Sequence, residues 1–115
     1  MPKRIYLKGL PQERLWTRVK FNGPILVRSL GRCWLWLGAK NKWGYGHLRL
    51  SPRRGSFAQA HRFAFVLLCG PYPKWTEPHH RCENPGCIRP SHQLPVSHAV
   101  NMGFIRRNHV TRKSN

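Results

Sequence analysis

The segment from His79 to His92, HHRCENPGCIRPSH, concentrates side chains that can bind metals or exchange protons. Three histidines and two cysteines fall within its fourteen residues. Cys82, Cys87 and His92 follow one another with four residues between each pair. Two thiolates and one imidazole at such close spacing supply three of the four ligands that a tetrahedral zinc ion needs. The spacing therefore predicts a zinc site, and the alternative is four unrelated cysteines with His92 on the surface.

The fourth ligand must come from outside this segment. We expect it to be Cys33, which stands at the start of an apolar strand-like segment and could meet the loop. Cys69 lies in an apolar helical segment, where a buried free thiol is the simpler expectation. The basic start of the chain lacks the apolar stretch of a secretory signal, so we expect an intracellular protein whose cysteines are thiols or metal ligands.

His79 and His80 are adjacent, and adjacent residues of a strand point to opposite faces. One small site therefore cannot easily use both. We expect one imidazole to face the chemistry and the other to face solvent or the core.

The charge balance indicates the kind of partner. The chain has 115 residues with 21 Lys and Arg, three acids and a net charge of +18. Such a field attracts a polyanion, and nucleic acid is favoured over an anionic membrane surface or a merely soluble cationic surface. There is no Asp, and the only acids are Glu13, Glu77 and Glu83. A two-metal site, which needs several carboxylates, is therefore excluded.

Periodicity and turn residues predict one α+β domain over 1–115, with flexible basic tails at 1–10 and 108–115. No apolar run is long enough to span a membrane. A sparse apolar core of this size usually needs a staple such as a metal. The expected elements are a helix over 10–23, a strand over 32–38, a hairpin of 44–50 with 55–60, a buried helix over 60–70, a loop over 71–78 and a helix over 98–107.

Residues 79–103, together with RLWTRVKFNGPI, CWLWLGAKNKWGYGHLRL and AHRFAFVLLCGPYP, resemble the HNH or His-Me finger nucleases, close to the His-Cys box homing endonucleases. The likeness covers most of residues 11–107, and its specific part is the pattern H-x-C-x4-C-x4-H with an Asn nine residues later. It implies a zinc-stapled ββα-metal fold with an antiparallel β-ribbon. It also implies site-specific, Mg2+-dependent cleavage of double-stranded DNA that leaves 5′ phosphates and 3′ hydroxyls.

The resemblance also implies a role for each matching residue. His80 would be the general base, Asn101 would bind the catalytic Mg2+, and Arg62 or a ribbon arginine would stabilise charge on the phosphate. The pair formed by His61 and Arg62 recurs in the family without a role that we can derive. The structural zinc would be held by Cys33, Cys82, Cys87 and His92. The DNA-reading ribbon would carry His47, Arg49, Arg53 and Arg54. The alternative for Arg53 and Arg54, which stand at the turn, is that they are ordinary solvent-exposed charges with no role in binding.

Two positions depart from the family pattern. His79 stands where many relatives have a metal-binding Asp, and Arg89 stands where an Asn usually braces the loop that holds the base. The alternatives are a zinc-stapled nucleic-acid-binding module without activity, and a small basic structural protein of a ribonucleoprotein or virion. A double-strand cut would most simply need a homodimer.

The excess of cations generates one prediction that needs no structure. Affinity for double-stranded DNA should fall steeply between about 50 and about 200 mM salt, because each neutralised phosphate releases a counterion. A titration by fluorescence anisotropy measures the slope. A flat titration would remove electrostatic DNA binding from consideration.

Overall fold

The computed structural model describes residues 9–104, so the expected tails, apart from Gly9 and Leu10, lie outside the described residues. Its elements are α1 (Pro11–Trp16), β1 (Val19–Lys20), η1 (Arg28–Leu30), β2 (Leu35–Trp36), β3 (His47–Arg49), β4 (Phe57–Gln59), α2 (Ala60–Cys69), β5 (Thr76–His80), η2 (Pro90–His92) and β6 (Gln93–Ser97). A helix follows over 98–104. None of the described helices is both long and apolar enough to cross a bilayer.

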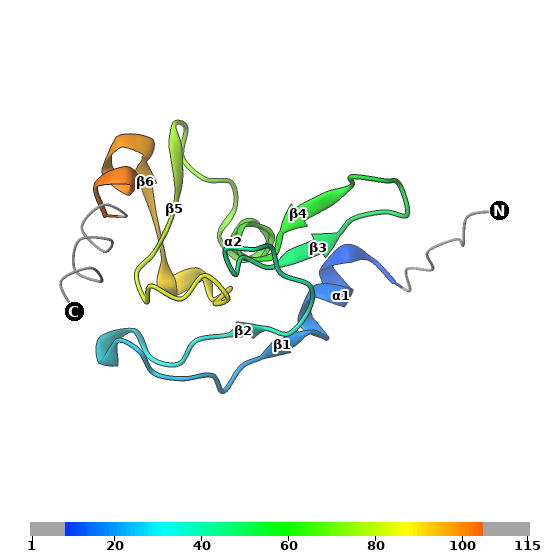
Figure 1. Ribbon diagram of the computed structural model, residues 1–115, viewed down its shortest axis with the longest axis horizontal. Helices are drawn as coiled ribbons and strands as arrows, with labels where there is room; N and C mark the ends of the chain where they lie inside the picture. Colours follow the sequence, from blue (N-terminus) through cyan, green and yellow to red (C-terminus); the bar gives the residue numbers. More distant parts are fainter. Residues whose placement is uncertain (1–8, 105–115) are drawn as a thin grey trace.

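The strands pair as three separate antiparallel sheets of two strands each: β1 with β2, β3 with β4, and β5 with β6. In Figure 1, α2 lies between the β3–β4 hairpin and the β5–β6 hairpin. α2 contacts α1, β4 and η2, so it links the parts of the chain around it. The structure is therefore a small α+β fold in which each sheet depends on neighbours for its packing.

The β5–β6 hairpin carries the sequence that raised the question of chemistry. The two strands are in register from Thr76 opposite Ser97 to His80 opposite Gln93. The long connection between them holds Cys82, Cys87 and η2, and the helix over 98–104 starts directly after β6. This strand–strand–helix unit is visible on the left of Figure 1.

Trp36 lies at the centre of the main hydrophobic core. Its side chain is almost fully buried, and its indole Nε1 donates to the carbonyl of Ala39 at 2.9 Å. The buried members of this core are Leu15, Trp36, Leu48, Ala60, Ala64 and Ile88. A second, smaller cluster consists of three cysteines with Leu30 and Leu35 packed against it. The sequence predicted a sparse apolar core, and the structure adds a buried cluster of thiols to it.

The hairpin and the helix over residues 60–69 follow the sequence pattern. Leu48 is buried on β3 and Leu50 packs against the core, while His47 and Arg49 stay partly exposed. α2 begins at Ala60 and ends at Cys69 before Gly70, whose positive φ suits a helix end.

Four expectations about local structure are wrong in part. The first helix ends at Trp16, not near residue 23, because the chain turns back there: Val19 pairs with Trp36. An aromatic cluster of Trp16, Phe21 and Trp34, with ring centroids 5.1 to 6.2 Å apart, holds that turn. The strand expected over 32–38 is reduced to β2, because its other residues bond to loops on either side.

The other two differences concern the second half of the chain. Thr76–Pro78 belong to β5 and not to the proline-rich loop. Pro78 is tolerated in the strand because β5 is an edge strand, where a residue without an amide hydrogen can stand opposite β6 without losing a ladder hydrogen bond. Cys69 is exposed, not buried. Only the first half of α2 packs on the core, and the residues of its last turn, Val66 to Cys69, are exposed to solvent.

The contact between Gly46 and Trp36 gives a test of this core. A Cβ at Gly46 would clash with the Trp36 ring and lie 3.0 Å from the Cβ of Ala60. Gly46→Ala should therefore destabilise the fold by about 1–3 kcal/mol, measured by thermal or urea unfolding. Gly103→Ala is the matched control, because its Cβ would meet no atom within 4 Å and Ala favours a helix. Equal stability of the two variants would contradict this packing.

Candidate metal centre and the histidine face

The structure brings together all four residues predicted as zinc ligands. Cys33 precedes β2, Cys82 and Cys87 lie in the β5–β6 connection, and His92 ends η2. Their ligand atoms all lie within 4.8 Å of one another, and all four residues are buried. Such a Cys3His cluster could bind a metal such as zinc.

His92 is oriented for coordination through Nδ1. Its Nε2 lies 2.7 Å from the carbonyl oxygen of Leu30, which can only accept, so Nε2 carries the proton. The unprotonated Nδ1 lies 3.7 Å from the sulfur of Cys33 and 3.5 Å from the sulfur of Cys87. Ligands of a tetrahedral zinc with ordinary Zn–S and Zn–N bonds are about 3.6 Å apart. The cluster therefore has the spacing of a metal site, and Leu30 supplies the outer hydrogen bond that fixes the imidazole.

The three thiols of the cluster lie close enough to shift one another's pKa. The hydrogen bond from Cys87 lowers the pKa of the Cys82 thiol to about 4, against the effect of burial. The same hydrogen bond and burial raise the pKa of Cys87, and burial raises the pKa of Cys33. One thiolate is thus favoured, while two further thiolates in the same space need a cation to balance them.

The connection between Cys82 and Cys87 is held by its own backbone and by β2. The amide of Glu83 donates to the carbonyl of His80, and the amide of Cys87 donates to that of Asn84, each at 3.0 Å. Two more hydrogen bonds join this connection to the chain around β2. The Trp36 amide donates to the carbonyl of Gly86 at 2.9 Å, and the Ile88 amide donates to the carbonyl of Trp34 at 2.8 Å. The segment before β2 is therefore placed beside the loop, which explains why Cys33 completes the cluster.

Arg89 braces the loop from outside. Its guanidinium donates to the carbonyl of Arg32 at 2.8 Å and lies 5.4 Å from the centre of the Trp34 ring. Both partners belong to the segment around Cys33. The residue that departs from the family pattern therefore ties the loop to the segment that supplies the fourth cysteine.

His80, at the end of β5, faces the protein interior. Its side chain is 7% exposed, and its Nε2 lies 3.1 Å from the carbonyl oxygen of Cys87. A carbonyl can only accept, so the proton sits on Nε2 and the lone pair sits on Nδ1. The ring lies 4.7 Å from that of His61 and 5.6 Å from that of Tyr45. Burial lowers the pKa of His80, which keeps the imidazole neutral at pH 7.

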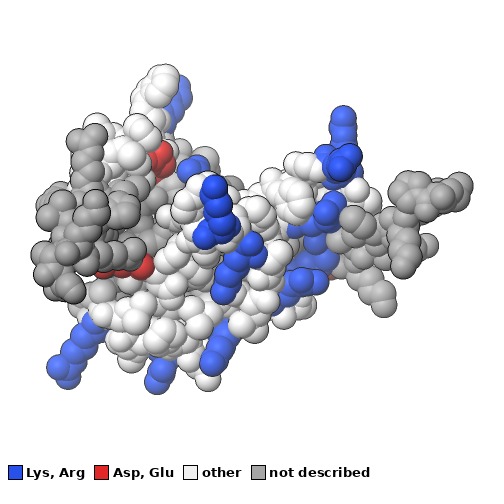
Figure 2. Space-filling view, in the orientation of Figure 1, with Lys and Arg blue, Asp and Glu red and all other residues white. Residues whose placement is uncertain are grey.

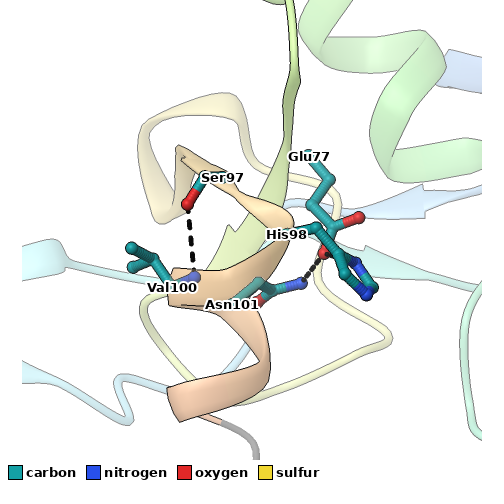
Figure 3. A network of polar contacts seen from close by, with 5 residues as sticks. All are labelled: Glu77, Ser97, His98, Val100 and Asn101. Atoms are coloured by element: carbon teal, nitrogen blue, oxygen red, sulfur yellow. Dashed lines mark hydrogen bonds and ion pairs between the residues drawn. The ribbon is translucent and has the colours of Figure 1, made fainter.

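His79 points to the opposite face, towards the helix over 98–104. Its ring stacks on Phe104 with centroids 4.1 Å apart, and the Asn101 side chain acts to raise the pKa of His79 against the effect of burial. Asn101 also donates from its amide to Glu77 at 2.8 Å, as Figure 3 shows. His98 lies 3.0 Å from the same carboxylate oxygen. Glu77, His79, His98 and Asn101 thus form one polar group, which we call the helix-side cluster.

Of the four members of the helix-side cluster, only Asn101 has a role predicted from the sequence. Glu77 and His79 share one face of β5 because they are two residues apart, and that alternation was the available signal. The hydrogen bond from Asn101, together with His98, lowers the pKa of Glu77, so its carboxylate is ionised. The cluster therefore offers a carboxylate, an amide and two imidazoles on one exposed edge.

The two residues of the His-Arg pair have different surroundings. His61 is 2% exposed, its Nδ1 has no hydrogen-bond partner among residues 9–104, and burial beside His80 lowers its pKa to about 3. Arg62 is exposed, and its Nε donates to the Gln59 side chain at 2.7 Å. The guanidinium of Arg62 lies 5.9 Å from the centre of the Tyr72 ring, and its charge contributes to the lowered pKa of Glu77.

The residues expected on the ribbon lie on the β3–β4 hairpin and its turn. The ring of His47 lies 5.6 Å from that of Phe57, and the guanidinium of Arg49 lies 4.7 Å from the same ring. Arg53 and Arg54 are exposed at the turn between the strands. Figure 2 shows Lys and Arg side chains spread over the visible face of the molecule, with few acidic atoms among them.

Comparison with known proteins gives one informative likeness. The chain is 35% identical over 81 residues to Protein 2.8 of Escherichia phage T7, which covers 70% of this chain and 49% of that protein. The chain thus spans about half the length of this relative, whose name describes no activity. No protein-family profile matches, and no solved structure matches. Function must therefore be inferred from the sites themselves.

Removal of one cysteine tests the metal centre. Cys33→Ser should reduce metal content after purification and lower the melting temperature, because three remaining ligands bind more weakly and binding supplies folding energy. Metal content is measured by mass spectrometry of the ion, and stability by calorimetry with and without a chelator. Cys69→Ser is the matched control, since Cys69 is exposed and outside the cluster. A chelator that leaves the wild-type melting temperature unchanged would refute the metal centre.

Proposed function

We propose that the protein is a DNA endonuclease of the HNH or His-Me finger type. The observation that carries the proposal is the unit formed by β5, β6 and the following helix, with His80 at the end of the first strand and Asn101 on the helix. The Cys3His cluster lies in the connection between the strands. The unit thus contains both residues that the resemblance selects, His80 on the inner face of β5 and Asn101 on the helix beside the opposite face.

His80 is the general base of the proposed reaction. The hydrogen bond from Nε2 to Cys87 leaves Nδ1 as the only nitrogen that can accept a proton from water. Burial keeps the ring neutral, and the water then attacks the phosphorus in line with the leaving 3′ oxygen. The products are a 5′ phosphate and a 3′ hydroxyl.

The helix-side cluster is the proposed place of the catalytic cation. A divalent ion such as Mg2+ would supply charge stabilisation on the phosphate and the leaving oxygen. The donor set fits this ion only in part: Asn101 and Glu77 offer oxygen, while His79 offers nitrogen. His79 thus occupies the place of the metal-binding Asp of many relatives. Arg62 is exposed, its charge contributes to the lowered pKa of Glu77, and it would stabilise negative charge on the phosphate.

The Cys3His cluster would hold zinc with a structural role, because all four positions are taken by protein ligands and none is left for substrate. DNA would be bound by the general positive charge and by His47, Arg49, Arg53 and Arg54 of the β3–β4 hairpin, in a groove of the duplex. A homodimer would allow both strands to be cut.

A second candidate is a zinc-stapled nucleic-acid-binding module without activity. One observation favours it: His80 is only 7% exposed, so a water molecule has little access to its ring. The hydrogen bond between Asn101 and Glu77 also satisfies the amide that would have to turn towards a cation. Both candidates share the charge and the metal centre, and only the nuclease needs His80 and Asn101.

Cleavage of supercoiled plasmid DNA and of a mixed genomic DNA with Mg2+ tests the proposal. His80→Ala should lower the rate by about 10² to 10⁴, because the general base is lost. Asn101→Ala should also lower it, and this loss should be partly offset by higher Mg2+. Cys69→Ser is the control that should keep full activity. Metal content and melting temperature of each variant are measured alongside, so that loss of activity is separated from loss of fold.

Two outcomes would change the assignment. Wild-type rates in His80→Ala would remove His80 from the role of base. Failure of the wild type to cut either DNA, with salt-dependent binding retained, would favour the binding module.

A further inference from the structure

Trp75 has an unusual conformation and an unusual position. Its φ is +64°, which lies in the left-handed region that L residues with large side chains rarely adopt. Its side chain is 92% exposed, more than any other large hydrophobic residue of the described chain. The strained backbone costs free energy, and the exposed indole gains none from burial on folding, so folding stability does not favour Trp at this position.

The strain arises from a tight turn just before β5. The amide and the hydroxyl of Thr76 both donate to the carbonyl of Pro73, at 3.2 and 2.6 Å. These bonds close the four-residue turn Pro73-Lys74-Trp75-Thr76, with Trp75 in the third position. A turn with positive φ at this position ordinarily has Gly or Asn there. The bulky indole is therefore not what the turn itself requires.

The loop that carries the turn is anchored to the body of the protein. Tyr72 stacks on Phe65 of α2 with ring centroids 4.2 Å apart and planes 8° apart. The Tyr72 hydroxyl also donates to the buried side chain of Gln93, at 2.7 Å. Pro71 and Pro73 restrict the backbone on either side of Tyr72. The indole is thus presented to solvent from a constrained base, in the segment between α2 and β5.

The faces of the Trp75 indole are free to receive a flat partner. Among residues 9–104, no aromatic ring or cation is stacked on it, and its exposure agrees. Trp43 offers a contrast, because the ammonium of its neighbour Lys42 lies 4.4 Å from its ring centre. An exposed aromatic ring on a strongly basic protein, next to a lysine such as Lys74, is the arrangement that stacks unpaired nucleobases while a cation meets the phosphate.

We infer that Trp75 is a stacking site for a nucleobase that is unpaired or displaced from the duplex. The inference rests on the proposed binding of nucleic acid. An exposed Trp beside a Lys could also enter an anionic membrane, but the net charge of +18 is spread along the chain and favours a polyanion that contacts many residues.

The position of Trp75 relative to β5 predicts where the base lies. His80 follows five residues later, and a strand advances about 3.3 Å per residue, so the two residues are up to about 17 Å apart. That length corresponds to about five base-pair steps of 3.4 Å. The stacked base should therefore lie within about five nucleotides of the phosphate at His80.

Binding of gapped DNA tests the inference. The probes are a fully paired duplex and the same duplex with a short single-stranded gap, each labelled with fluorescein and titrated by anisotropy without Mg2+. Trp75→Asn removes the ring and keeps a residue that tolerates positive φ. It should bind the gapped DNA about 5- to 100-fold more weakly, with little change for the paired duplex. Its melting temperature should equal or exceed that of the wild type, since strain is relieved.

Two further variants make the result specific. Trp75→Phe keeps a stacking ring and should retain most of the affinity for gapped DNA. Leu68→Asn removes another exposed apolar side chain, 57% exposed at the end of α2, and should bind like the wild type. Wild-type affinity in Trp75→Asn, or an equal loss in Leu68→Asn, would overturn the inference.

The remaining outcomes separate the inference from the proposed function. Unchanged binding of Trp75→Asn to both DNAs, with steep salt dependence, overturns the stacking site and leaves the nuclease proposal standing. Absence of DNA binding in the wild type overturns both. If Trp75→Asn loses binding to vesicles of phosphatidylglycerol and phosphatidylcholine but still binds both DNAs like the wild type, Trp75 contacts a membrane and the inference is overturned.

Discussion

The convergence of four ligand atoms within 4.8 Å is the constraint on which the rest of the structure depends. It joins the segment before β2, the β5–β6 connection and the end of η2, which are also linked by hydrogen bonds and by the short bridge between Leu35 and Cys87. Two-residue and three-residue strands contribute little stability alone. The buried thiol cluster takes the place of the larger core that a chain of this size lacks.

Alternation along β5 organises the polar residues on either side of this centre. Pro78 and His80 face inwards, where His80 meets His61 and Tyr45, and Glu77 and His79 face the helix over 98–104. Two neighbouring histidines thus have separate surroundings, one dry and one at an exposed edge. A single strand thereby provides two kinds of chemistry: a neutral imidazole fixed by a carbonyl, and a group of oxygen and nitrogen donors beside an ionised carboxylate.

Local patterns predicted the local parts of the structure. The β3–β4 hairpin, α2 and the spacing of Cys82, Cys87 and His92 follow from turn residues, periodicity and ligand distance along the chain. The early end of α1, the exposure of Cys69 and the extent of β5 depend on contacts between distant segments, and a pattern within one segment cannot contain them. The grouping of Asn101 with Glu77, His79 and His98 was missed for the same reason. Its members act together only after β5 has paired with β6 and the chain has turned into the helix.

Cys87 belongs to two arrangements at once. Its sulfur is one of the four atoms of the Cys3His cluster, and its carbonyl oxygen holds the proton of His80 on Nε2. The same residue therefore connects the assembly of the thiols to the tautomer of the imidazole. In a chain that has not yet folded neither arrangement exists, so closure of the loop around Cys87 sets the tautomer of His80 and gathers the thiols together.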